Sequence, residues 1–207
     1  MENVKTAREL ERVVGGRWHG VSIFGFNEKH AGEFLEPHVD RYCEALKLAV
    51  ANEILLDPDR FTCPGARYAF GCTSDLKDGM VRNLVDKKGY TPEYAEKLID
   101  DTPHFQVKPW GIGLNLNVEP KVLIAQLQPE QAMRLIQVYH VKLKKPFQTE
   151  ISSVISACGN VTVKAHITQE MAISFGCDDS RAFGGISRDR LYAGLPYEKE
   201  RVLMAQQ

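Results

Sequence analysis

Apolar residues recur at helical spacing in several segments of this chain. Within residues 39–52, the side chains of Cys43, Leu46 and Ala49 fall on one face, which predicts a helix that turns Cys43 toward the interior. Residues 4–14 show a similar stripe and end at a Gly-Gly pair, a common helix terminator. Further helices are predicted at these positions: two within 74–101, one over 129–143, a short one that ends at Cys158 and one after Pro196.

Other segments carry the spacing of β-strands. Residues 110–118 alternate apolar side chains with Gly and Asn, whereas residues 122–125 are continuously apolar and suit a strand buried on both faces. Further strands are predicted over 18–26, 147–151, 170–175 and 191–195. This succession predicts an α+β or mixed α/β fold, in which a mixed sheet covered by helices forms one compact domain over residues 1–207.

A helix is also predicted to begin at Cys63, because Pro64 suits the first helical position, where its missing N–H is not needed. The sulfur of Cys63 would then lie beside free backbone N–H groups and the positive end of the helix dipole. Such a position favours thiolate over thiol. A thiolate there could act as a nucleophile, a redox centre or a metal ligand.

Residues 73–102 carry many charges and few apolar side chains. Gly89 is expected to end one helix, and Thr91 with Pro92 to begin the next as capping hydroxyl and first-turn proline. The segment is interpreted either as a helical cover that moves over a site or as a solvated helical pair.

Composition narrows the class of protein. The chain has 207 residues, of which 43% are hydrophobic and 26% charged, and its formal net charge is −1. These values are typical of an ordinary soluble globular protein and give no basic field for nucleic acid. No apolar run approaches the roughly 18 residues of a membrane span. The first residues lack the apolar core of a secretory signal, so we expect a cytoplasmic protein without a membrane or nucleic-acid partner.

The chain contains five cysteines, an odd number that argues against a complete set of disulfides. Four of them lie at predicted helix ends, strand ends or inward faces: Cys43, Cys63, Cys158 and Cys177. Four thiolates are the usual ligands of a cubane iron–sulfur cluster or a structural zinc ion. The spacing itself does not favour a metal site, because no Cys-x-x-Cys pair occurs, and buried unreactive thiols are the alternative. Cys72 is either a resolving thiol for Cys63 or a small core residue.

Two arginines lie near these cysteines in the sequence. Arg181 follows Cys177 by four residues, and Arg67 lies one turn into the helix of Cys63. Each guanidinium could bind a small anion, or could instead pair with a surface acid or reach solvent. The sequence holds no phosphate-binding loop, no Gly-x-Ser-x-Gly and no paired-histidine metal motif, so no motif supports a hydrolase or a nucleotide-binding protein.

Several separated blocks resemble domain of unknown function family 169, which is known from archaea and anaerobic bacteria. The blocks are YCEALKLA at 42–49, TCPGARYAFG at 62–71, PEQAMRL at 129–135, SAC at 156–158 and ISFGCDDSR at 173–181. The resemblance covers about residues 20–197 and implies no settled activity. It singles out Cys43, Cys63, Cys158 and Cys177, while Cys72 occupies a position where members often carry another residue. An oxygen-avoiding setting with four such thiols implies iron–sulfur rather than zinc.

The leading hypothesis is therefore a cytoplasmic metalloprotein with a redox or small-anion-binding role. Cys43, Cys63, Cys158 and Cys177 would hold an iron–sulfur cluster, and Arg67 and Arg181 would bind a small anionic ligand or a redox partner nearby. Two alternatives stay open: a metal-free thiol enzyme whose nucleophile is Cys63, and a non-enzymatic ligand-binding module in which the cysteines fill the core. The sequence leaves the oligomeric state undetermined.

Overall fold

Helices make up most of the regular structure in the computed structural model, which describes residues 2–25, 35–72 and 75–198. In these ranges the helices are α1 Glu2–Val13, α2 Tyr42–Leu48, α3 Pro64–Ala69, α4 Lys77–Lys88, α5 Pro92–Asp100, α6 Pro129–Leu143, α7 Lys164–Thr168 and α8 Asp178–Ala182, with the 3-10 turn η1 Pro58–Arg60 and the π-helix η2 Ser156–Val163. None of the helices in the described part of the chain has the length and apolar character to cross a bilayer.

A six-stranded sheet runs through the molecule in the order β2-β3-β1-β4-β6-β5. Its strands are β1 Arg17–Phe24, β2 Ile54–Leu56, β3 Gly111–Leu114, β4 Val122–Leu127, β5 Ala172–Ser174 and β6 Leu191–Pro196. All paired strands are antiparallel, and the isolated bridge between Leu35 and Ile54 is the parallel contact found among the described residues. The predicted fold class is confirmed as α+β, with an antiparallel sheet rather than one of mixed direction.

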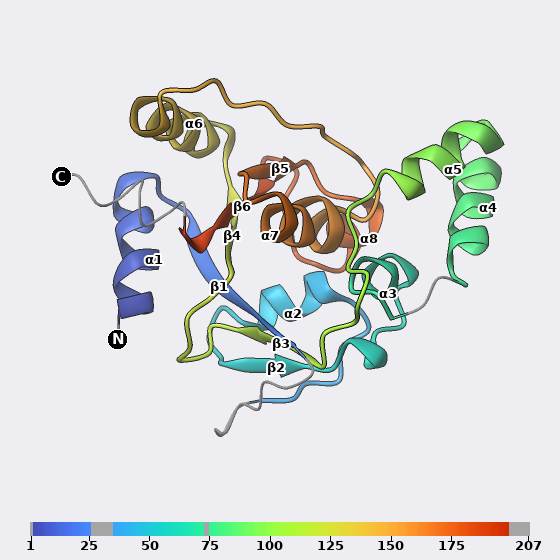
Figure 1. The fold of residues 1–207 in the computed structure, drawn as a ribbon, viewed down its shortest axis with the longest axis horizontal. Helices are drawn as coiled ribbons and strands as arrows, with labels where there is room; N and C mark the ends of the chain where they lie inside the picture. The colour runs from blue at the N-terminus through green and yellow to red at the C-terminus, as the bar shows by residue number, and fades with distance from the viewer. Residues whose placement is uncertain (1, 26–34, 73–74, 199–207) are drawn as a thin grey trace.

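Both faces of the sheet are covered, which explains the continuous apolar run in β4. Val122 and Ile124 pack into the hydrophobic cluster that includes α2, α3 and η2. Leu123 and Leu127 belong to a second cluster, with residues of α1 and α6. Figure 1 shows α1 and α6 together on one side and α2, α3, α7 and α8 on the other. The residues discussed below lie on the side of α2 and α3.

The α4–α5 hairpin lies at one end of the molecule, beyond α3 (Figure 1). Gly89 ends α4 in the left-handed conformation, with φ of 71°. The Thr91 hydroxyl accepts a hydrogen bond from the N–H of Tyr94 and so caps α5, with Pro92 at its first position. The two helices predicted for residues 74–101 are confirmed, as are their boundaries at Gly89 and Thr91.

Three predicted elements differ in the structure, and a fourth lies mostly outside the described residues. The helix expected over 39–52 is the shorter α2, and residues 147–151 form no strand. The helix expected to end at Cys158 instead begins just before it and runs on as η2 and α7, because Gly159 serves close packing there rather than a helix end. The helix expected after Pro196 lies mostly outside the described residues. The short elements β2 and α8 were not predicted.

Candidate functional site

A cavity of about 470 Å³ lies between α2, α3, η2, α8 and the α4–α5 hairpin, and four cysteines line it. Cys43 comes from α2, Cys63 caps α3, Cys158 lies in η2 and Cys177 caps α8. These are the four cysteines singled out from the sequence. The fifth, Cys72, is not among the lining residues, and its thiol donates to the carbonyl oxygen of Pro58 at 3.3 Å. We refer to this space as the cysteine cavity.

Local backbone contacts hold Cys63 at the start of α3. The N–H groups of Thr62 and Cys63 both donate to the carbonyl oxygen of Asp40, at 3.1 and 3.0 Å. This anchors the loop beside the segment that leads into α2. Pro64 then occupies the first turn, as predicted, so that the chain enters the helix directly after the cysteine.

Cys158 is positioned by a tight contact between α3 and η2. Ile155, which precedes η2, has a φ of 46°, a left-handed conformation that is unusual for a β-branched residue. Its side chain lies against two glycines: a Cβ added at Gly65 would be 3.2 Å from Ile155 Cγ1, and one at Gly159 would be 2.9 Å from Ile155 Cγ2. Glycine at these two positions therefore lets the helices of Cys63 and Cys158 approach each other.

Contacts with α8 and the loop that follows it position Cys43 and Cys177. Cys43 is 7% exposed, and a Cβ added at Gly184 would lie 2.8 Å from the Cβ of Cys43. Ser180 fixes the first turn of α8, since its hydroxyl accepts from the N–H of Cys177 and donates to the carbonyl oxygen of the same residue, each at 2.8 Å. The segment around α8 therefore packs against Cys43 and fixes the backbone of Cys177.

The thiols influence one another electrostatically. Burial is the main cause that raises the pKa of Cys43 to about 12, and the charges of Cys177 and Cys63 raise it further. Burial likewise raises the pKa of Cys158 well above its usual value, with added effects from Cys63, Cys177 and Cys43. A thiolate at one of these cysteines would thus raise the pKa of its neighbours in the cavity, with burial as the larger effect.

The expectation that the helix end makes Cys63 a thiolate is corrected by these surroundings. Burial raises the pKa of Cys63 to about 11, and the carboxylate of Asp179 raises it as well. Hydrogen bonds from the backbone N–H groups of Ala66 and Gly65 lower the pKa, as predicted, but they are outweighed. The Cys63 thiol instead donates to Asp179 Oδ2 at 3.6 Å. Without a bound cation, Cys63 is a thiol at neutral pH.

The two arginines proposed as anion ligands lie in different surroundings. Arg181 lines the cysteine cavity, but its guanidinium donates to the carbonyl oxygens of Phe175, Ser187 and Arg190 and so holds the wall together. Arg67 does not line this cavity, and it acts electrostatically on Cys72, whose pKa burial raises to about 11 and Arg67 lowers.

Arg41 lines the cavity and was not singled out from the sequence. Its guanidinium lies 3.8 Å from the centre of the Phe183 ring, and its Nε is 3.6 Å from Asp179 Oδ2. That Nε atom is buried and makes no hydrogen bond within the described residues. The sequence signal that could have identified Arg41 is its place immediately before the helix of Cys43, with Glu44 pairing back to it.

The α4–α5 hairpin forms the outer wall of the cysteine cavity. Met80, Leu84 and Ile99 contribute apolar surface to it. Lys88, at the end of α4, forms an ion pair with Asp178 of α8 and so joins the hairpin to the opposite wall. The segment interpreted either as a helical cover or as a solvated helical pair therefore lines the same cavity as the four cysteines.

The four cysteines fit a thiophilic metal in donor type and in location. Sulfur ligands select iron–sulfur clusters, zinc and Cu(I), and all four thiols border the same space. Among residues 2–25, 35–72 and 75–198, however, no three His, Cys, Asp or Glu side chains are already arranged as a metal site. Rotation of the thiols about their Cα–Cβ bonds would be needed to direct the sulfurs to one point.

Comparison with known proteins yields a family without an assigned activity. The profile of domain of unknown function family 169, described as an uncharacterised ArCR family, matches residues 9–206. A curated relative, the uncharacterized protein MJ0308 of Methanocaldococcus jannaschii, is 23% identical over 168 residues, which cover 77% of this chain and 72% of that protein. No solved structure matches the chain.

Proposed function

The chain belongs to domain of unknown function family 169, as its sequence blocks predicted, and we propose that it is a cytoplasmic metalloprotein whose centre is held in the cysteine cavity. Cys43, Cys63, Cys158 and Cys177 would bind an iron–sulfur cluster. The observation that carries this proposal is that these four cysteines, from four separate elements, line one cavity while Cys72 lies outside it.

The electrostatics of the cavity support a bound cation. The thiols of Cys43, Cys63 and Cys158 have raised pKa values and resist ionisation, because each thiolate would add negative charge to a desolvated space. A metal centre reverses this balance, since its positive charge favours the thiolates and releases their protons. The N–H groups of Gly65 and Ala66 would then stabilise the negative charge on the Cys63 sulfur.

When bound, a cluster would supply one-electron transfer, and the protein would tune it. Hydrogen bonds to the sulfurs and exclusion of water both set the potential of such centres. The α4–α5 hairpin would cover the cavity, and Arg41 lies on its wall, where its guanidinium pairs with Asp179 and Glu44. A small anionic ligand or a redox partner would approach at this wall. Arg181 would act by holding the wall, through the three carbonyl oxygens that it binds.

Anaerobic purification followed by metal and sulfide analysis tests the proposal. We expect broad visible absorbance and stoichiometric iron and acid-labile sulfide in the wild-type protein. Both should be lost in Cys158→Ser and retained in Cys72→Ser, which removes a thiol that does not line the cavity. If the protein contained zinc instead of iron, with the same dependence on the four cysteines, the proposed binding site would stand and the identity of the metal would change. A colourless protein free of metal under these conditions would contradict the proposal.

The same preparation separates the two other hypotheses. A metal-free thiol enzyme requires that Cys63 be alkylated much faster than the other cysteines at neutral pH, despite its raised pKa. A non-enzymatic binding module requires that replacing Cys63 or Cys177 leave both stability and ligand binding unchanged.

A further inference from the structure

A second cavity, of about 250 Å³, lies on the sheet beside α2 and contains no cysteine. Its polar and charged lining residues come from β1, α2, β4 and the region of β6: Arg17, His19, Lys47, Gln126, Arg190 and Tyr192. We call this set the basic pocket. Leu46 and Val50 of the α2 region give it one apolar wall. Gly184 separates it from the cysteine cavity, because this glycine lies against both Cys43 and the Tyr192 hydroxyl.

Positive charge in the basic pocket is not balanced by carboxylates. No Asp or Glu lines it, and Arg17, Lys47 and Arg190 form no ion pair with any residue that the structure describes. Asp189, next to Arg190 in the chain, accepts hydrogen bonds from the Ser187 hydroxyl and the Gln128 amide. The Ser187 hydrogen bond is the main cause that lowers the pKa of Asp189, and the charge of Arg190 adds a smaller effect without an ion pair between the two.

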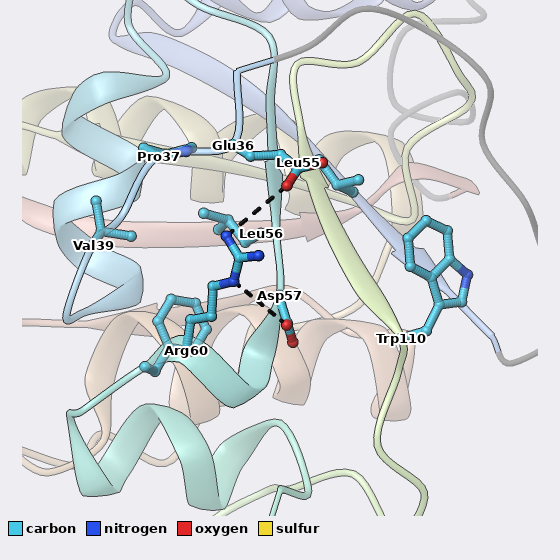
Figure 2. A pocket seen from close by; sticks show the side chains of 9 residues that line it. Glu36, Pro37, Val39, Leu55, Leu56, Asp57, Arg60 and Trp110 are labelled. Carbon is cyan, nitrogen blue, oxygen red and sulfur yellow. Dashed lines mark ion pairs between the residues drawn. The ribbon is translucent and has the colours of Figure 1, made fainter.

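Another depression, of about 200 Å³, also contains a cation, but that cation is paired with carboxylates. Figure 2 shows Arg60 in that depression, where its guanidinium pairs with Glu36 at 3.9 Å and with Asp57 at 3.7 Å. The cation there is already neutralised by the protein's own carboxylates. In the basic pocket the three cations remain available to a ligand of opposite charge.

The base of the basic pocket offers further hydrogen-bond donors. Tyr192 is 1% exposed, and its buried hydroxyl meets the geometric criteria for a hydrogen bond with none of the described residues. Burial raises the pKa of Tyr192, and the nearby Gln126 side chain partly opposes this effect. A buried polar group without a partner is uncommon in folded proteins and is satisfied when a ligand supplies an acceptor. The stem of Lys47 packs against Gly185, which has a φ of +68° and where an added Cβ would be 3.2 Å from Lys47 Cδ.

The positive potential is also felt by His19. Burial, and after it the Arg17 guanidinium, lower the pKa of His19 to about 4, so the imidazole is neutral at physiological pH. Its Nδ1 is 3.0 Å from Asn115 Nδ2, which orients the ring. A neutral His19 leaves Arg17, Lys47 and Arg190 as the charges that a ligand would meet.

We propose that the basic pocket binds a small dianion, a molecule that carries a phosphate group or two or more carboxylates. Arg17, Lys47 and Arg190 would hold the charged group, since guanidinium groups form paired hydrogen bonds with phosphate and carboxylate oxygens. Tyr192 would donate its hydroxyl proton to an oxygen of the ligand, and the wall of Leu46 and Val50 would contact its apolar part. This site is independent of the metal centre, because no cysteine contributes to it.

Isothermal titration calorimetry with inorganic phosphate and with citrate, at constant ionic strength set by sodium chloride, tests the proposal. We expect at least one of the two anions to bind one per chain and to raise the thermal unfolding midpoint. The dissociation constant should rise at least tenfold in Arg190→Gln and in Lys47→Gln, while Arg190→Lys should keep part of the affinity. Binding of phosphate alone would identify a phosphate site, and binding of citrate alone would identify a polycarboxylate site.

Arg134→Gln is the matched control, because Arg134 lies on exposed α6 and pairs with Glu130 away from the pocket. It should bind the anions like the wild type. No binding beyond that of chloride, or an equal loss in Arg134→Gln, would overturn the proposal. Metal content, measured in the same variants, should not change, so this result stands apart from that of the metal centre.

Discussion

At Cys63, two opposing effects decide the state of a single sulfur. The start of α3 supplies N–H groups that lower the thiol pKa, but burial and the Asp179 carboxylate raise it more, to about 11. Desolvation of a charge in a protein interior commonly exceeds the effect of a few partial charges at a helix end. In the metal-free protein Cys63 is therefore a protonated and slowly reacting thiol.

Replacing Asp179 with Asn should make Cys63 more reactive in the metal-free protein. The change removes a negative charge that raises the Cys63 pKa and leaves Arg41 paired with Glu44 alone, and both effects favour the thiolate. We expect iodoacetamide to label Cys63 several times faster at pH 8, as measured by peptide mass spectrometry. Asp57→Asn is the control, because Asp57 pairs with Arg60, does not line the cysteine cavity and should leave the rate unchanged. Equal rates in all three proteins would contradict this account of the pKa.

The position of Cys63 was predictable and that of Arg41 was not. The sequence Cys-Pro-Gly at residues 63–65 is a local signal, and these adjacent residues alone predicted the start of α3 correctly. Arg41 gains its importance from Phe183 and Asp179, which are far away in sequence. The pKa of Cys63 also depends on burial, which only the folded chain determines.

Among the elements, η2 contributes most to the assembly of the cysteine cavity. It carries Cys158 in a π-helix, a geometry often found at functional sites. Ile155 precedes it in a strained conformation and packs between Gly65 and Gly159. This packing brings two cysteine-bearing helices together that are almost one hundred residues apart in the chain.

Gly159→Ala should destabilise the protein. A methyl group at this position would approach Ile155 Cγ2 at 2.9 Å, Thr102 Cγ2 at 3.0 Å and the backbone oxygen of Pro103 at 3.1 Å. Overpacking of this kind typically costs ~1–3 kcal/mol of unfolding free energy. Urea denaturation measures the change.

The control for this prediction is Gly79→Ala in α4, where an added Cβ meets nothing within 4 Å. Alanine is favoured over glycine in a helix by about 0.5–1 kcal/mol, so this variant should be slightly more stable than the wild type. A Gly159→Ala protein as stable as the control would show that the contact with Ile155 is not tight.

The α4–α5 hairpin should expose the cavity when its link to α8 is broken. Lys88 joins the two through Asp178, so Lys88→Gln should increase the labelling rate of Cys177 and Cys63 in the metal-free protein. Lys77→Gln removes an ion pair with Asp100 that lies within the hairpin, and it should leave labelling unchanged. If the cysteines of both variants were labelled at the same rate, the hairpin would not act as a cover over the cavity.

Elements with strong end signals were predicted best. The sequence around Gly89 and Thr91 fixes α4 and α5, and Pro129 fixes the start of α6. Gly159 misled the prediction because its role is close packing within a helix, which resembles a helix stop in sequence. The three-residue strand β2 is too short for a periodic pattern, and pairing with β3 makes it a strand.

For the whole molecule, the buried thiols link stability to pH. The pKa values of Cys43 and Cys63 are raised from 9.0 to about 12 and about 11, so the folded state retains protons that the unfolded chain loses. Their contribution to stability is complete below pH 9.0 and is lost as the pH rises toward these folded values, by about 1.4 kcal/mol for each unit of pKa difference.

The metal-free protein should therefore lose stability between pH 9 and pH 11, and Cys43→Ser should lose less over the same interval. Urea denaturation at several pH values gives the slope of unfolding free energy against pH for each protein. Subtracting one slope from the other removes the contribution of Lys and Tyr side chains, which both proteins share. Identical slopes for the two proteins would contradict the raised pKa of Cys43.

The convergence of the four cysteines is a property of the whole chain. The strand order β2-β3-β1-β4-β6-β5 places β5 at one edge and β2 at the other, and no local signal specifies it. Cys43 and Cys177 meet the other two only because the loop of Gly184 folds back over α2. The four cysteines could be identified from the sequence, because they lie in the blocks that resemble the family. Tertiary contacts bring them to one cavity.

X-ray absorption spectroscopy at the metal edge of the anaerobically purified protein tests the central claim most directly. The account predicts a first shell made of sulfur at about 2.3 Å, which is lost together with the metal in Cys158→Ser and preserved in Cys72→Ser. A first shell of oxygen and nitrogen, or a protein that carries no metal, would contradict it.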